Sequence, residues 1–274
     1  MTAGSASLSG RKVLVTGANR GVGAAFVQAA LARGAAAVVA AARNPASVPR
    51  FDGASSGNSG TSGTSASGSA GVSRVVPVRL DVRDGDTIAA AAREHGDVDL
   101  LVSNAAVTHQ APVLAEGDED ALRDLMDTNF FGPLRLVRGF RDSLRRPGSG
   151  VIFVLSVAAV TLSRSSPVYG ASKAASLMLA LALREELRDY GATVTAALPG
   201  YIDTDMAAGF DSPKASPIEV AERTLDGWLA GEPTVWPDLF AELVRDAVGE
   251  PFRKLLDEPR GAMVGVHAAF ARGT

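Results

Sequence analysis

The chain has 274 residues, of which 46% are hydrophobic and 21% charged, so it can bury a large core and is not expected to be disordered as a whole. Its formal net charge of −3 at pH 7 argues against a nucleic-acid binder that works by neutralising phosphates. The sequence contains no cysteine, which excludes disulfides, thiolate catalysis and cysteine-ligated metal centres.

Short β-branched segments alternate with Ala- and Leu-rich segments of helical length, a pattern typical of βαβ units around a parallel sheet. Strands are predicted at Lys12–Thr16, Ala37–Ala42, Arg74–Leu80, Val98–Ser103, Val151–Ser156, Thr193–Leu198 and Thr234–Trp236. Helices are predicted at Val22–Arg33, Asp86–Glu94, Glu119–Leu144, Val168–Tyr190 and Pro217–Ala230. Ser216 and Glu219 form a capping box at the start of the last helix, with Pro217 at its first position. These elements predict an α/β fold: a doubly wound, seven-stranded parallel sheet with helices on both faces.

Residues 52–73 consist almost entirely of Gly, Ser, Thr and Ala, and they lie between the second and third predicted strands. This composition predicts a flexible surface loop that replaces much of a crossover helix. The loop does not separate two domains, because the strand beyond it is needed by the same sheet. We therefore expect residues 1–274 to form a single domain.

The first ten residues are small and polar, and the longest apolar runs fall far short of the roughly 20 residues that span a bilayer. We therefore expect a cytoplasmic protein without a signal peptide or a membrane span. The three histidines, His95, His109 and His267, lack the spacing of metal ligands, so no metal site is expected.

A glycine-rich turn follows the first predicted strand and opens directly into the first helix. Residues 16–23 read Thr-Gly-Ala-Asn-Arg-Gly-Val-Gly. Glycines let the backbone approach a pyrophosphate, and a helix N-terminus supplies free N–H groups and the positive end of the dipole. Three glycines in a Gly-rich chain can also make a tight turn that binds nothing. The position of the turn after the first strand favours a dinucleotide site.

The second predicted strand ends in Ala42 followed by Arg43, where an NAD-binding protein would place Asp or Glu to accept from the ribose 2′-hydroxyl. Arg20 in the glycine turn adds a second positive charge nearby. Two arginines and no carboxylate favour a 2′-phosphate, and hence NADP(H) over NAD(H). The alternative for each arginine is a solvated surface charge.

Tyr169 and Lys173 stand four residues apart at the start of a long predicted helix, so both side chains project from one face. Ser156 ends an apolar strand thirteen residues before Tyr169, at the carboxyl edge of the sheet. A free tyrosine has a pKa of about 10, which a neighbouring ammonium lowers by stabilising the phenolate. Tyr169 is therefore a candidate general acid or base, and Ser156 can hydrogen-bond a substrate oxygen.

Four further motifs accompany the glycine turn and the Tyr–Lys pair. Asp81-Val82 follows the third predicted strand, Asn104-Ala105-Ala106 follows the fourth, Asn129 lies in the next helix, and Pro199–Thr204 follows the sixth strand. In this order and spacing the chain resembles the short-chain dehydrogenase/reductase superfamily over nearly its whole length. The resemblance implies a Rossmann-type fold, a nicotinamide cofactor and hydride transfer.

The resemblance also implies a role for each motif. Asp81 and Val82 would contact the adenine, Asn104 the ribose region, and Ile202 and Thr204 the nicotinamide carboxamide. Lys173 would also hold the ribose hydroxyls of the nicotinamide, and Asn129 would relay protons through water to Lys173. The predicted catalytic residues are Asn129, Ser156, Tyr169 and Lys173. The predicted cofactor-binding residues are Gly17, Asn19, Arg20, Gly21, Val22, Gly23, Arg43, Asp81, Val82, Asn104, Ala105, Tyr169, Lys173, Pro199, Gly200, Ile202 and Thr204.

The motifs predict an NADP(H)-dependent oxidoreductase of the carbonyl reductase or alcohol dehydrogenase type. Residues 200–216, with Tyr201, Met206 and Phe210, are expected to close over a small, partly apolar carbonyl or alcohol substrate. Two alternatives stay open. One is an enzyme of the same fold that catalyses an unusual redox, isomerisation or elimination step in a biosynthetic pathway, and the other is a non-catalytic NADP(H)-binding regulatory protein.

The long helix that carries the Tyr–Lys pair is rich in apolar residues. Leu177, Met178, Leu181 and Leu187 look too numerous for one covered face, and in similar proteins this helix packs against a second subunit. A homodimer or homotetramer is therefore expected.

Overall fold

Seven parallel strands form one sheet in the computed structural model, which describes residues 7–51 and 74–258. Residues 1–6, 52–73 and 259–274 lie outside the described residues, and with them the predicted flexible loop and His267. All seven predicted strands are confirmed, with ends that differ slightly from the prediction. They are β1 (Lys12–Thr16), β2 (Ala37–Ala42), β3 (Val75–Arg79), β4 (Leu100–Ser103), β5 (Gly150–Val154), β6 (Thr193–Ala197) and β7 (Thr234–Val235).

The strand order is β3-β2-β1-β4-β5-β6-β7, and every neighbouring pair is parallel. The chain winds outward from β1 in two directions, which confirms the doubly wound, Rossmann-type fold. All carboxyl ends therefore lie along one edge of the sheet. The order reverses between β1 and β4, and open sheets of this kind bind ligands outside that point.

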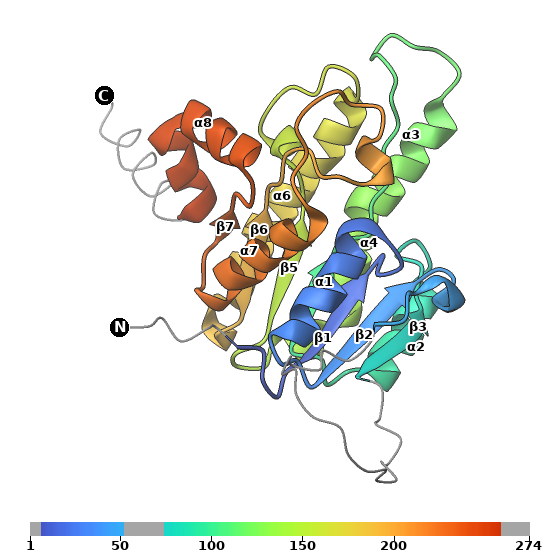
Figure 1. Ribbon diagram of the computed structural model, residues 1–274, viewed down its shortest axis with the longest axis vertical. Helices are drawn as coiled ribbons and strands as arrows, with labels where there is room; N and C mark the ends of the chain where they lie inside the picture. Colours follow the sequence, from blue (N-terminus) through green and yellow to red (C-terminus); the bar gives the residue numbers. More distant parts are fainter. Residues whose placement is uncertain (1–6, 52–73, 259–274) are drawn as a thin grey trace, which may run out of the picture.

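Helices cover both faces of the sheet (Figure 1). The α-helices are α1 (Gly21–Ala32), α2 (Gly85–Glu94), α3 (Glu119–Met126), α4 (Gly132–Gly139), α5 (Arg141–Leu144), α6 (Pro167–Leu187), α7 (Pro217–Leu229) and α8 (Leu239–Asp257). Short 3₁₀ segments lie at Pro45–Ser47, Val157–Ala159, Arg188–Tyr190 and Asp205–Ala207, and a π-helical segment lies at Asp127–Phe131. No helix in the described part of the chain is long and apolar enough to cross a membrane.

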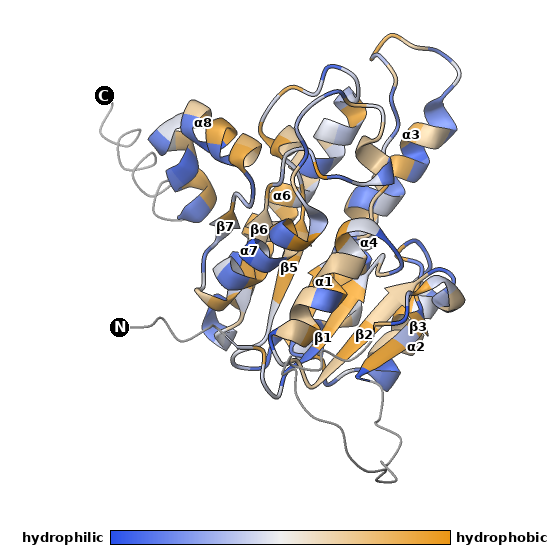
Figure 2. Ribbon diagram, viewed as in Figure 1, coloured by the Kyte–Doolittle hydropathy of each residue, from blue (hydrophilic) through white to orange (hydrophobic). Residues whose placement is uncertain are grey.

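The two faces of the sheet carry two separate hydrophobic clusters. Val13 and Val15 of β1 point into a cluster with α1 and α7, while Leu14 between them points into a cluster with α2, α4 and α6. Successive side chains of a strand point to opposite faces, and because both faces are covered the strands are mostly apolar (Figure 2). This packing fixes the carboxyl ends of the strands relative to one another.

The helix predicted at Glu119–Leu144 is wrong as a single element, because the chain forms α3, the π-helical segment, α4 and α5 in succession. Pro133 has no backbone N–H, so the carbonyl of Asn129 four residues earlier cannot accept the usual α-helical hydrogen bond. The hydroxyl of Ser176 on α6 donates to that carbonyl instead, at 2.6 Å. A tertiary hydrogen bond thus holds the irregular turn that contains Asn129.

Two further details differ from the prediction at the C-terminal end. Ser216 lies at the N-cap of α7 and Pro217 is its first residue, but the Ser216 side chain makes no capping hydrogen bond, so the predicted capping box does not form. Helix α8 was not predicted at all. It begins after Asp238, whose carboxylate accepts from the backbone N–H of Ala241 at 2.9 Å and caps the helix.

Candidate active site

The glycine turn after β1 has no room for side chains at its key positions. Gly17 and Gly21 have φ angles of 66° and 52°, a region that favours glycine. A Cβ on Gly23 would lie 2.0 Å from the carbonyl oxygen of Gly17. The turn therefore brings the start of α1 against the end of β1, as a phosphate-binding turn requires.

Thr16, the last residue of β1, holds this turn to the end of β4. Its hydroxyl oxygen accepts from the backbone N–H groups of Asn104 at 2.9 Å and Ala105 at 3.1 Å, and it donates to the carbonyl of Val102. The side-chain amide of Asn104 donates to the carbonyl of Thr16 at 2.8 Å. Asn104 and Ala105 thus support the glycine turn through Thr16. The predicted cofactor-binding residues begin at Gly17 and do not include Thr16.

The N-terminus of α1 fits a phosphate group. Arg20 is its N-cap residue, no side chain caps the helix, and its first turn contains no acidic residue. The first N–H groups of an α-helix lack partners within the helix and attract anions. Asn19, Gly21 and Val22 are partly exposed at this end. The residues present therefore fit the pyrophosphate of a dinucleotide.

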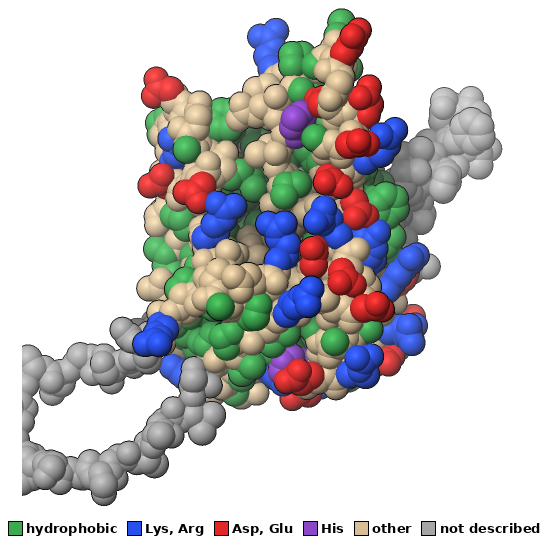
Figure 3. Space-filling view, turned by 90° about the vertical axis from the view of Figure 1, so that its right-hand side faces the viewer, with side chains coloured by type: hydrophobic (Ala, Val, Ile, Leu, Met, Phe, Trp, Pro, Cys, Tyr) green, Lys and Arg blue, Asp and Glu red, His purple; other side chains and the backbone are tan. Residues whose placement is uncertain are grey.

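The two arginines predicted for a 2′-phosphate behave differently. Arg43 is exposed directly after β2, and no ion pair to it is found among the described residues. Arg20 instead forms an exposed ion pair with Asp205 at 2.6 Å. In the view of Figure 3, Lys and Arg side chains gather across the middle of the face among Asp and Glu side chains. Arg43 is free to meet an added phosphate, whereas Arg20 would first have to leave Asp205.

Ser156, Tyr169 and Lys173 come together at the carboxyl end of β5. Lys173 is buried on α6, and its Nζ donates to the carbonyl of Val154, the last residue of β5, at 3.0 Å. The same Nζ lies 5.6 Å from the centre of the Tyr169 ring. Ser156 follows two residues after β5, and its hydroxyl accepts from the backbone N–H of Ala158 at 3.1 Å. The strand and the helix together fix all three side chains.

Burial shifts the pKa values of this group. It raises the pKa of Tyr169 to about 12, and a side-chain hydrogen bond with Ser156 opposes that rise only in part. It also lowers the pKa of the Lys173 ammonium to about 8. The prediction that the pKa of Tyr169 lies below its ordinary value is therefore wrong, because loss of hydration raises this pKa more than the hydrogen bond with Ser156 lowers it. At neutral pH Tyr169 is a protonated phenol, which suits it to donate a proton.

Asn129 lies in the π-helical segment and is almost fully buried. Its side chain makes a two-way hydrogen bond with the backbone of Val107, accepting from the N–H and donating to the carbonyl at 2.9 Å each. It also donates to the Ser172 hydroxyl, which in turn donates to the carbonyl of Tyr169. These bonds tie the segment after β4 to the first turns of α6. The relay from Asn129 to Lys173 that the resemblance implies stays a prediction.

The remaining predicted residues lie along the same edge of the sheet. The carbonyl of Pro199 accepts from the N–H of Val157 at 2.9 Å. The methyl group of Thr204 lies near Gly21, where a Cβ would approach it to 3.2 Å, and Ile202 pairs with Ala215 in an isolated bridge. Asp81 is half-buried after β3, and its carboxylate accepts from the backbone N–H of Arg83. Gly200 and the buried Val82 complete this edge.

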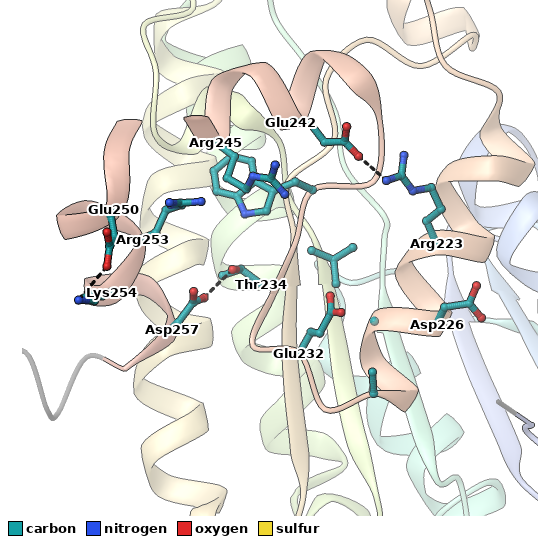
Figure 4. A pocket seen from close by; sticks show the side chains of 14 residues that line it. Arg223, Asp226, Glu232, Thr234, Glu242, Arg245, Glu250, Arg253, Lys254 and Asp257 are labelled. Atoms are coloured by element: carbon teal, nitrogen blue, oxygen red, sulfur yellow. Dashed lines mark hydrogen bonds and ion pairs between the residues drawn. The ribbon is translucent and has the colours of Figure 1, made fainter. Parts of the chain in front are cut away.

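A groove of about 720 Å³ lies elsewhere, between α7, β7 and α8, and none of the predicted site residues lines it. Its walls carry charges of both signs that pair with one another, among them Arg223 with Glu242 and Lys254 with Glu250 (Figure 4). Among the described residues no group of acidic or histidine side chains could hold a metal ion. His95 is buried, and His109 pairs with Asp118 at 2.8 Å.

Comparison with known proteins agrees with this geometry. The sequence profile of the short chain dehydrogenase family matches residues 11–215. A 3-oxoacyl-[acyl-carrier-protein] reductase, MabA from Mycobacterium avium, is 30% identical over 206 residues, which cover 73% of this chain and 71% of that protein. The structure of a short chain dehydrogenase from Burkholderia cenocepacia J2315 in complex with NADP superposes with a TM-score of 0.76 at 31% identity, covering 88% of this chain and 94% of the other.

Proposed function

Because the chain belongs to the short-chain dehydrogenase family, we propose that it is an NADP(H)-dependent oxidoreductase that interconverts a ketone or aldehyde and an alcohol. One observation carries the proposal. Tyr169, the buried Lys173 and Ser156 share the sheet edge that also holds an uncapped, glycine-lined helix N-terminus. Such an edge can hold a dinucleotide and deliver a proton beside it.

Each side chain has a role that follows from its contacts. A reduced nicotinamide, when bound, supplies the hydride. Tyr169 gives its proton to the carbonyl oxygen as negative charge develops there, since its pKa of about 12 keeps the phenol protonated. Ser156 donates a hydrogen bond to the same oxygen. Lys173 holds positive charge near the ring of Tyr169 and so stabilises the phenolate that proton transfer leaves behind.

Residues of the glycine turn would hold the cofactor. The N–H groups at the start of α1 would bind the pyrophosphate, and Arg43 would pair with a 2′-phosphate. Asp81 and Val82 would contact the adenine, while Ile202 and Thr204 would contact the nicotinamide carboxamide. A preference for NADP(H) follows from the exposed guanidinium of Arg43 in the place where a ribose-binding carboxylate would stand.

Residues 200–216 would lie over the substrate, and backbone hydrogen bonds join the two ends of this segment. The backbone N–H of Ala215 donates to the carbonyl of Tyr201, and the N–H of Asp203 donates to the carbonyl of Ala215. The small-molecule substrate would therefore meet a segment whose ends are fixed.

A homodimer or homotetramer in the cytoplasm remains the expected form of the protein. The sequence argument for it is weakened, because Leu177, Leu181 and Leu187 are buried within the chain itself and only Met178, 64% exposed, is left for a partner. Light scattering at micromolar concentration tests the oligomer, and a monomer would contradict it.

Titration of the purified protein with NADPH and NADH, followed by fluorescence, tests the cofactor. Oxidation of the preferred cofactor against a panel of ketones, aldehydes and quinones then tests the reaction. Tight NADPH binding with carbonyl-dependent oxidation would support the proposal. Binding without oxidation by any member of the panel would contradict the reaction, and no binding at all would contradict the dinucleotide site.

A further inference from the structure

Helix α8 lies outside the part of the chain that matches the family, which ends at residue 215. It follows β7 and lies near the carboxyl edge of the sheet (Figure 1). Its Ala241 and Leu256 are buried in the cluster that also contains residues of α6, so the helix is anchored to the body of the protein. The proposed reaction uses no residue of α8.

Asp238 fastens the start of α8 to the turn after β6. Its carboxylate is buried, 4% exposed, and accepts from the N–H of Gly200 at 2.8 Å through one oxygen and from the N–H of Ala241 at 2.9 Å through the other. A Cβ on Gly200 would lie 2.7 Å from Cδ1 of Phe240. Hydrogen bonds from two N–H groups to one buried carboxylate leave little freedom to either segment. The first turn of α8 is thus held in contact with the Pro199–Thr204 motif.

Three aromatic side chains meet at this contact. The ring of Tyr201 packs against the rings of both Phe210 and Phe240, with centre-to-centre distances of 5.2 Å and 5.3 Å. Such tilted aromatic pairs attract one another beyond their burial of apolar surface. Two of the rings come from residues 200–216 and one comes from α8. The aromatic cluster therefore joins α8 to the segment proposed to lie over the substrate.

Apolar side chains around this cluster remain uncovered. Phe240 is 43% exposed, and Leu239 and Leu243, one helical turn apart on α8, are 72% and 61% exposed. Large exposed apolar side chains that stand close together in this way are typical of a binding surface. Phe240 contacts Gly200 and Tyr201 of the segment proposed to lie over the substrate, and this contact favours the substrate of that site as the occupant.

We propose that the first turn of α8 forms one wall of the substrate site and that the substrate carries a bulky apolar group, an aliphatic chain or an aromatic ring, against Phe240 and Tyr201. This proposal rests on the proposed function, because the apolar group belongs to the carbonyl compound that the protein is proposed to reduce. Phe240 is thereby a specificity-determining residue. Asp238 is a positioning residue that acts through the backbone of Gly200 and Ala241.

A homologous series of methyl ketones, from 2-butanone to 2-decanone, tests the wall. In the wild type, kcat/KM with NADPH should rise by about 10-fold or more along the series, since each buried methylene contributes up to about 4-fold. Phe240→Ala should lose about 10-fold on 2-decanone and less than about 2-fold on 2-butanone, with an unchanged Kd for NADPH. Leu255→Ala, at an exposed site farther along α8, is the matched control and should behave as the wild type.

The positioning role of Asp238 is tested by comparing KM and kcat on a long and a short ketone, because a purely structural defect would affect both ketones alike. Asp238→Ala should raise KM for 2-decanone with a smaller change in kcat and leave the kinetics on 2-butanone nearly unchanged, whereas Asp238→Asn, which retains one acceptor oxygen, should recover part of the loss. Equal losses of kcat on both ketones would show a general loss of structure and contradict the positioning role.

An error in the proposed substrate wall and an error in the proposed function would give different results. Turnover that is independent of chain length and of Phe240 would overturn the wall and leave the reaction standing. If no ketone is reduced, binding of 2-decanone is measured by calorimetry for the wild type and for Phe240→Ala. Weaker binding by the variant would support the wall without the reaction. Equal binding by both proteins would overturn the wall. Conversion of an oligomer to a monomer by Phe240→Ala would show that the patch is a subunit contact and would also overturn the wall.

Discussion

Replacing Lys173 with methionine should stabilise the protein while removing its activity. The pKa of the Lys173 ammonium falls from an ordinary 10.5 to about 8 because the group is buried. At about 1.4 kcal/mol for each pKa unit, holding the charge at pH 7 costs the folded chain about 3 kcal/mol. Methionine removes that cost but leaves the carbonyl of Val154 without its hydrogen bond, which is worth about 1 kcal/mol. The net gain is about 2 kcal/mol, or about 4–8 °C in Tm.

The pH dependence of this gain follows from proton linkage. Between pH 8 and 10.5 the unfolded chain keeps the Lys173 proton that the folded chain has lost, so wild-type stability rises with pH over this window. Below pH 8 both states hold the proton and the folded state bears the full cost. The variant lacks this titration. Its advantage over the wild type should therefore be full at pH 7 and vanish as the pH approaches 10.5.

Urea unfolding of both proteins at pH 7 and pH 10 measures this difference, because every other titrating group is common to the two and cancels. Lys254→Met is the control, since that side chain is 69% exposed and its replacement should give no comparable gain. A Lys173→Met variant that is less stable than the wild type at pH 7, or whose advantage is the same at both pH values, would refute the account of Lys173 as a buried, poorly solvated charge.

Three further substitutions test other parts of the site. Gly23→Ala should abolish NADPH binding in a fluorescence titration, because its Cβ would meet the carbonyl of Gly17. The control Gly85→Ala, with open space around it, should bind NADPH normally. Tight binding by Gly23→Ala would contradict the assignment of the glycine turn as the phosphate-binding turn. Asp205→Asn should release Arg20 and lower the Kd for NADPH several-fold without changing that for NADH, and an equal shift for both would show that Arg20 does not serve the 2′-phosphate. Ser176→Ala should cost about 1–3 kcal/mol in urea unfolding by leaving the buried carbonyl of Asn129 without a donor, and unchanged stability would mean that the carbonyl has another partner.

The sheet could be predicted from the sequence because its signals are local. Most strands are short, mainly apolar runs bounded by turn residues, and in the central strands burial on both faces makes these runs nearly continuous. The glycine turn and the Tyr169–Lys173 spacing also act within a few residues. Their positions in the fold follow once the strands are known.

The remainder depends on contacts between distant segments. Pro133 interrupts the long helix, and the result is an ordered turn at Asn129 because Ser176 lies opposite it. Asp238 could have been recognised as a helix cap before an apolar run, but its bond to Gly200 joins residues 38 positions apart. The ion pair of Arg20 with Asp205 spans 185 positions, which no local pattern reveals. The pKa shifts likewise arise from burial in the folded chain.

Tyr169 is proposed to donate the proton in an NADPH-dependent carbonyl reduction, and single-turnover oxidation of bound NADPH by a ketone measures that step. For Tyr169→Phe we expect a rate about 10²- to 10⁴-fold below that of the wild type, with the Kd for NADPH within about 2-fold. A Tyr169→Phe variant that keeps most of the wild-type rate would contradict this role.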